Sequence, residues 1–154
     1  MQSALETSLR LVAEHTQNIE GSWWIIGSTA ALLSGFTDFD PDDVDLFGST
    51  ETMSAFVRSF GVEPASGALH FQFRSMPYQR ISLPDTTPIE IMGNLEVVTA
   101  GRWHHLSVTT RVEVTGFGTP LWIPSVREQI AIFELFGRPK DLAKAKILKR
   151  GLMA

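Results

Sequence analysis

The sequence predicts an α+β fold in which helices pack on a mixed β-sheet. Helix and strand patterns alternate over the first part of its 154 residues, short strand patterns follow, and the last part is helical. A length near 150 residues predicts one domain, which we expect over residues 1–154. The hydrophobic fraction of 44%, with ten Phe and four Trp residues, is sufficient to build a packed core.

Helix and strand patterns alternate in the N-terminal part of the chain. Ser3 and Glu6 form a capping-box pair, and apolar residues follow them at helical spacing. The next apolar run is short and ends at Gly27, as expected for a buried strand. We therefore expect helices over 3–16, 28–34 and 51–60, strands over 23–26 and 43–47, and a polar loop over 37–42.

Short strand patterns precede two helices in the C-terminal part. Ser125 and Glu128 form a second capping-box pair, and Gly137 is suited to end the helix that follows. Pro139 favours the first position of another helix. The strands of this part are expected over 69–74, 78–83 and 89–92, and in pieces between 104 and 114.

The composition excludes several classes of protein. The 13 basic and 17 acidic residues give a net charge of −4, which argues against a generic basic surface for nucleic acid. The chain has no cysteine, so disulfides, zinc ribbons and thiol catalysis are excluded. The N-terminus lacks the apolar core of a signal peptide, and the longest uncharged stretch, 21–37, is too rich in Gly, Ser and Thr to span a membrane. We expect a cytoplasmic protein that does not bind membranes.

Asp43 and Asp45 are the first candidates for chemistry. Residues two apart on a strand point to the same face, so these carboxylates should project together while Val44 and Leu46 face the core. Like charges this close disfavour joint ionisation, and a bound divalent cation such as Mg²⁺ removes the conflict. The alternative is that both acids are simply solvated, as we expect for the acids of the loop over 37–42.

Gly27 and Ser28 lie at a predicted strand-to-helix turn. A glycine there lets a ligand approach the backbone, and the free N–H groups of the helix start suit a phosphate. Ser28 adds a hydroxyl group. A Gly-Ser turn alone is more often structural, but one that precedes a paired-Asp strand is typical of metal-assisted phosphoryl or nucleotidyl transfer.

Glu90 is the third candidate. It lies between Ile89 and Ile91 on a predicted strand, where an unpaired buried polar group would cost roughly 2–7 kcal/mol. A metal ion shared with Asp43 and Asp45 would offset that cost. The alternative is an edge strand whose polar face is exposed to solvent.

This pattern resembles the DNA polymerase beta-like nucleotidyltransferase superfamily. The usual motif of a hydrophobic residue and Gly-Gly or Gly-Ser, a spacer of about ten residues and Asp-x-Asp is matched by Ile26-Gly27-Ser28 and Asp43-Val44-Asp45. Glu90 matches the third carboxylate. The segment 137–142 looks like the Arg-x-Lys-Asp-Leu segment of small bacterial members, including relatives of toxin–antitoxin nucleotidyltransferases, and the resemblance covers about residues 21–148.

The resemblance implies transfer of a nucleoside monophosphate from a nucleoside triphosphate, such as ATP, to an acceptor, with Mg²⁺ or Mn²⁺. It implies that Asp43, Asp45 and Glu90 hold the metal ions, with Glu90 also the possible base for the acceptor. It further implies that Gly27 and Ser28 contact the triphosphate. The loop 36–42 departs from the relatives, because it has no Arg and carries extra acids.

Lys140 is a further candidate for nucleotide binding. A lysine in the first turn of a helix opposes the helix dipole by about 0.3–1 kcal/mol, which hints at a function, and the resemblance makes it a phosphate contact. The alternative is an ordinary surface lysine. Arg74 and Arg80, near predicted strands, are weaker candidates for the same role.

Two classes of function remain open. One is an enzyme whose acceptor is a small molecule, RNA or protein. A variant of this class is a domain that recruits a partner chain to supply the acceptor site. The other is a non-catalytic relative that senses nucleotides or binds a protein, such as a toxin–antitoxin component. The three carboxylates favour the enzyme, whereas the altered loop and small size favour the relative.

Overall fold

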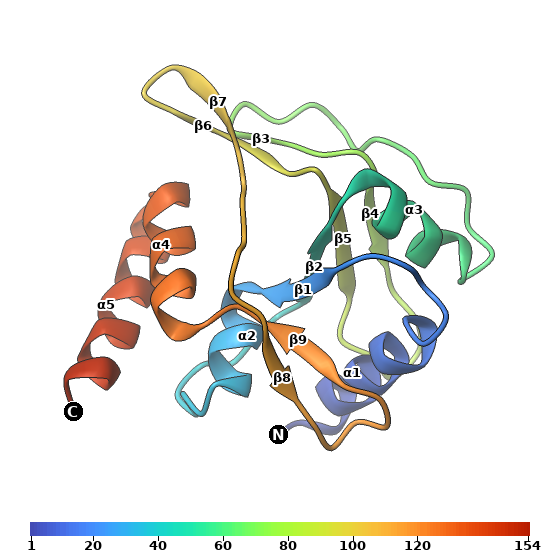
Figure 1. Ribbon diagram of the computed structural model, residues 1–154, viewed down its shortest axis with the longest axis horizontal. Coiled ribbons are helices and arrows are strands. Elements are labelled where there is room, and N and C mark those ends of the chain that lie inside the picture. Colours follow the sequence, from blue (N-terminus) through green and yellow to red (C-terminus); the bar gives the residue numbers. More distant parts are fainter.

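A four-stranded mixed sheet lies at the centre of the computed structural model, which describes residues 1–154 and confirms the predicted α+β fold (Figure 1). Its strand order is β1-β2-β5-β4. β2 and β5 run parallel, whereas β1 and β4 are antiparallel to their neighbours. The bounds of these strands are Trp23–Ile26 for β1, Val44–Gly48 for β2, Tyr78–Ile81 for β4 and Ile89–Gly93 for β5.

Helices pack on one face of this sheet to form the largest hydrophobic core. Val44 and Leu46 of β2 and Ile89 and Ile91 of β5 are buried in this core, as the alternation along the strands predicted. The core also takes apolar side chains from α1 (Ser3–His15) and α3 (Thr50–Arg58). The intervening residues of β2 and β5 therefore face away from this core.

The other three helices follow one another outward from the central sheet, and the outer two lie at the left of Figure 1. α2 (Gly27–Leu33) follows β1 directly, and α4 (Val126–Phe136) and α5 (Pro139–Met153) pack against each other. Ser125 caps α4 by accepting a bond from the N–H of Glu128, and Gly137 ends the helix with a φ of 69°. Both features were predicted, but the capping box expected at Ser125 and Glu128 is incomplete, because the Glu128 carboxylate accepts hydrogen bonds from the N–H groups of Thr109 and Thr110 instead. The capping box expected at Ser3 and Glu6 was wrong, since Ser3 lies inside α1.

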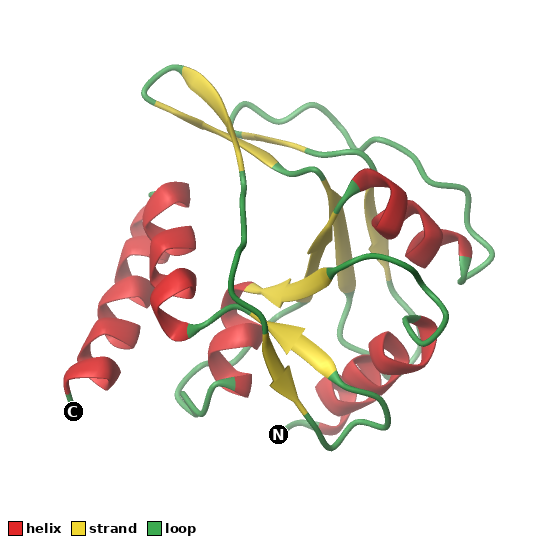
Figure 2. Cartoon of the chain, viewed as in Figure 1, coloured by secondary structure: helices red, strands yellow, loops and turns green.

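Two smaller sheets complete the fold (Figure 2). A three-stranded antiparallel sheet has the order β3-β6-β7, and β8 pairs with β9. The bounds are Phe73–Arg74 for β3, Glu96–Thr99 for β6, Arg102–His105 for β7, Val112–Val114 for β8 and Leu121–Ile123 for β9.

The predicted strand boundaries in this region were partly wrong. Only Phe73–Arg74 of the predicted strand 69–74 pairs with a neighbour, because Leu69 and Phe71 point into solvent and no strand lies beside them. The strand predicted over 78–83 ends at Ile81. The sequence pattern also missed β6 and β9, which have only four and three residues. No helix in the structure is both long enough and apolar enough to cross a membrane.

Candidate active site

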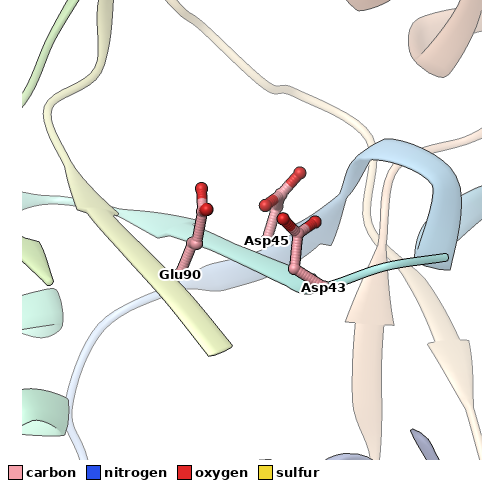
Figure 3. A group of neighbouring side chains, drawn as sticks. All are labelled: Asp43, Asp45 and Glu90. Atoms are coloured by element: carbon pink, nitrogen blue, oxygen red, sulfur yellow. The ribbon is translucent and has the colours of Figure 1, made fainter. Parts of the chain in front are cut away.

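Three carboxylates converge on the face of the central sheet that points away from the core (Figure 3). One oxygen from each of Asp43, Asp45 and Glu90 lies within 4.8 Å of the others. Asp43 immediately precedes β2, Asp45 is the second residue of that strand, and Glu90 is the second residue of β5. The three acids that the sequence singled out are therefore neighbours in space.

Strand register explains why Glu90 joins the aspartates. β2 and β5 are parallel neighbours, and Asp45 pairs with Glu90 in the register. Residues directly opposite each other on adjacent strands point to the same face. The buried neighbours on either side, Ile89 and Ile91, hold that face of β5 in place through the core.

The crowding of negative charge raises the pKa values of two of these acids. Burial raises the pKa of Asp45 well above its ordinary value, and the charges of Asp43 and Glu90 raise it further. Burial also raises the pKa of Glu90, followed by the charge of Asp43, while Arg80 opposes the shift. In the metal-free protein the cluster therefore favours retention of a proton, and a bound cation would release it.

Arg80 is the nearest positive partner of the cluster. It lies on β4 opposite Glu90, and its Nη1 donates a hydrogen bond to Glu90 Oε1. The same Nη1 lies 3.6 Å from Asp43 Oδ2. The sequence suggested Arg80 as a minor candidate for phosphate binding, but the structure shows it bound to two of the three acids.

Gly27 provides the space for Asp45. Its φ is +72°, which favours glycine, and a Cβ built on it would lie 2.7 Å from Asp45 Oδ2. The glycine is thus required by the carboxylate, whatever ligand the turn binds. Ser28 follows it in the first turn of α2. Thr29, which the sequence analysis did not single out, donates a hydrogen bond of 2.8 Å to the carbonyl oxygen of Asp43 and so fixes the entry to β2.

The start of α5 carries a helix cap and a row of lysines. Arg138 and Asp141 form a bidentate ion pair at the helix start, with Oδ2 of buried Asp141 2.6 Å from Nε of Arg138. Lys140 is exposed and makes no hydrogen bond or ion pair. Lys144, four residues further along the same helix face, is half-buried, and its positive charge lowers the pKa of Asp45. Lys144 was not among the predicted site residues, although its spacing from Lys140 is a usable signal.

A cleft of about 870 Å³ opens beside Glu90. One wall is the central sheet, which contributes Asp45, Glu90 and Tyr78. Burial raises the pKa of Tyr78, and the charge of Glu90 adds to the shift. Residues of the three-stranded sheet, including Trp103, form another wall. Ser28 is not part of the lining.

The acid cluster fits a hard divalent cation. Its three donors are carboxylates, which Mg²⁺ and Mn²⁺ prefer, and they are already gathered within the distance that one ion can bridge. Arg80 provides only one positive charge for the three carboxylates. A divalent ion bound here would therefore remove the remaining repulsion.

Three solved structures share the fold. No family model and no curated protein matches the chain by sequence. A candidate nucleotidyltransferase from Thermotoga maritima aligns with 20% identity over 95% of this chain and 91% of its own, with a TM-score of 0.73. The antibiotic-resistance factor ANT(2'')-Ia aligns with 16% identity over 96% and 82%, with a TM-score of 0.53. An antigenic nucleotidyltransferase-like protein from Paracoccidioides brasiliensis aligns with 14% identity over 94% and 73%, also with a TM-score of 0.53. The chain therefore has the nucleotidyltransferase fold, as the resemblance of its motifs predicted.

Proposed function

We propose that this chain is a nucleotidyltransferase that uses Mg²⁺ or Mn²⁺ to move a nucleoside monophosphate from a nucleoside triphosphate to an acceptor. The supporting observation is the convergence of Asp43, Asp45 and Glu90 within 4.8 Å on a fold that its structural neighbours share. One neighbour is an antibiotic-resistance factor, which adds a small molecule to the acceptor classes, beside RNA and protein.

The proposed reaction exchanges a phosphoanhydride bond of the triphosphate for a phosphoester bond to the acceptor. An acceptor oxygen forms a bond to the α-phosphorus, the bond from that phosphorus to pyrophosphate breaks, and pyrophosphate leaves with the bonding electrons. Divalent ions, when bound, orient the triphosphate and neutralise its charge. The acceptor proton passes to a base, and Glu90 is our candidate because it borders the cleft and its raised pKa suits proton transfer.

The remaining site residues are assigned to the metal ions and the triphosphate. Asp43 and Asp45 would hold the ions, and Gly27 and Ser28, at the start of α2, would contact the triphosphate. Lys140 would reach the phosphates from the first turn of α5, with Lys144 on the same helix face.

One observation favours a non-catalytic nucleotide-sensing or protein-binding relative. Arg80 already bridges Glu90 and Asp43, so the acids have a cationic partner without a metal ion. In such a protein the cluster would be structural, and nucleotide would bind without being consumed.

The two functions are separated by a transfer assay. The purified chain is incubated with each triphosphate labelled at the α-phosphate, with Mg²⁺ and a cell extract, and labelled products are identified. Asp45→Asn should abolish transfer, whereas Asp42→Asn, at an exposed acid outside the cluster, should not. Chelation of the metal should also stop transfer by the unaltered chain.

Thermal melting supplies the second readout. A triphosphate should raise the melting temperature only with Mg²⁺ or Mn²⁺ present, because a ligand that binds the native state stabilises it, and Asp45→Asn should remove this shift. A metal-dependent shift without any transfer would support the nucleotide-sensing relative. The absence of both transfer and shift would refute the proposed enzyme.

A further inference from the structure

The cleft beside Glu90 contains no free positive charge. Its lining carries two guanidinium groups and no lysine. Arg74 donates two hydrogen bonds to the carboxylate of Glu96, at 2.9 and 3.1 Å. Arg138 is held in the same bidentate way by Asp141. Both cations of the cleft are therefore already neutralised by the protein itself.

Acidic side chains outnumber the basic ones in the same lining. Asp45, Glu90 and Glu96 contribute three carboxylates against the two paired guanidinium groups. Nucleic acids are held by unpaired Lys and Arg side chains that neutralise phosphates. The lysines of α5 are the feature that would favour RNA, but none of them lines the cleft. The lining therefore offers no unpaired Lys or Arg side chain to the phosphates of a nucleic-acid acceptor.

The cleft offers flat and apolar surface instead. Four large apolar side chains that are unusually accessible to solvent line it: Leu69, Met76, Tyr78 and Trp103. The guanidinium of Arg74 lies 4.1 Å from the ring centroid of Trp103 and holds that ring in place. The volume of about 870 Å³ is within the range of small-molecule sites.

We propose that this cleft binds the acceptor, and that the acceptor is a small uncharged or cationic molecule with an apolar, planar part and a hydroxyl group. This inference rests on the proposed nucleotidyl transfer and names the substrate class of the same site. The hydroxyl oxygen attacks the α-phosphorus, pyrophosphate leaves, and the hydroxyl proton passes to the base. Trp103 and Leu69 form the binding surface for the apolar part.

The experiment separates acceptors by size and charge. A cell extract is divided by ultrafiltration into a small-molecule filtrate and a retained fraction, and each is incubated with the full chain, Mg²⁺ and labelled triphosphate. We expect label in a product of the filtrate that elutes from an anion exchanger before the free nucleoside monophosphate, because the phosphodiester bears one charge fewer. Label in the retained fraction that ribonuclease or protease releases would overturn the inference while the proposed function stands. Transfer to neither fraction would refute the proposed function and the inference with it.

Variants of the cleft test the binding surface with the filtrate as the probe. Trp103→Ala should raise the amount of filtrate that gives half-maximal labelling by about tenfold, a typical loss for one aromatic contact. Leu69→Ala should act in the same direction and, since its side chain is fully exposed, should not affect folding. Val112→Ala is the matched control, because Val112 is exposed but outside the cleft. If both cleft variants match this control, the cleft does not bind the acceptor.

Discussion

Replacing Arg80 with methionine should destabilise the metal-free protein much more than the metal-bound protein. Methionine keeps much of the apolar stem of the side chain and removes its charge. Arg80 is the only cation hydrogen-bonded to the acid cluster, through Glu90, and it lies 3.6 Å from Asp43. Its loss leaves three carboxylates within 4.8 Å of one another without that compensation.

The expected loss of stability follows from the separation between Arg80 and the acids. The substitution removes the attraction of Arg80: two opposite unit charges 3.6 Å apart, the separation of Arg80 and Asp43, attract by ~1.2 kcal/mol in water and by ~4.6 kcal/mol at an effective dielectric constant of about 20. Arg80 is 46% exposed and Glu90 20% exposed, so solvent screens part of this energy. We expect a loss of about 1–2 kcal/mol of unfolding free energy in chelator, near neutral pH.

Denaturant melts in chelator and in Mg²⁺ provide the assay. In Mg²⁺ the difference between Arg80→Met and the unaltered chain should shrink, because the ion supplies the missing positive charge. By linkage, the variant should bind Mg²⁺ up to about tenfold more tightly. Arg10→Met is the control, since Arg10 forms a similarly exposed pair with Glu6 away from the site, and it should change stability by less than about 0.5 kcal/mol in both conditions. An equal loss for Arg80→Met in chelator and in Mg²⁺ would refute the reasoning and make Arg80 an ordinary structural partner.

Three further predictions concern the acids, the glycine turn and the lysines. The pKa of Asp45 is raised in the folded state, so the contribution of Asp45 to stability is present below its unfolded pKa of about 3.8 and is lost as pH rises through the folded pKa. In denaturant melts with chelator, Asp45→Asn should therefore be at least as stable as the unaltered chain at neutral pH. This advantage of the variant should vanish on acidification. Clear destabilisation of Asp45→Asn at neutral pH would contradict the raised pKa of Asp45. Gly27→Ala should lower the unfolding free energy by about 2 kcal/mol or more and weaken the Mg²⁺-dependent melting shift. The control is Gly35→Ala, also at positive φ but with open space around it, which should lower the unfolding free energy by about 1 kcal/mol and leave the shift intact. Equal effects of the two variants would show that Asp45 does not need the space at Gly27. Lys140→Met should weaken triphosphate binding about tenfold in a titration with Mg²⁺. The control Lys146→Met, at another exposed lysine of α5, should not change this affinity. Unchanged affinity of the Lys140→Met variant would make Lys140 an ordinary surface residue.

Local patterns in the sequence predicted the five helices and the four strands of the central sheet. The caps at Ser125 and Gly137 act through backbone groups a few residues away, so they can be recognised without the rest of the fold. The alternation around Asp43 and Asp45 predicted which side chains enter the core, because the two faces of a strand depend only on the period of the chain. The family motif then connected these residues with Glu90.

Other features depend on which strands become neighbours. The register that places Glu90 beside Asp45 joins residues 45 positions apart, and Arg80 reaches the acids only because β4 pairs with the far edge of β5. The pairing of Arg74 with Glu96, which removes free charge from the cleft, likewise needs the β3–β6 register. No local period encodes such pairings, since strand partners are selected by the packing of the whole sheet. The sequence by itself therefore determined the types of the acidic residues and the faces they occupy, whereas the tertiary structure decided their ionic partners and the charge of the cleft beside them.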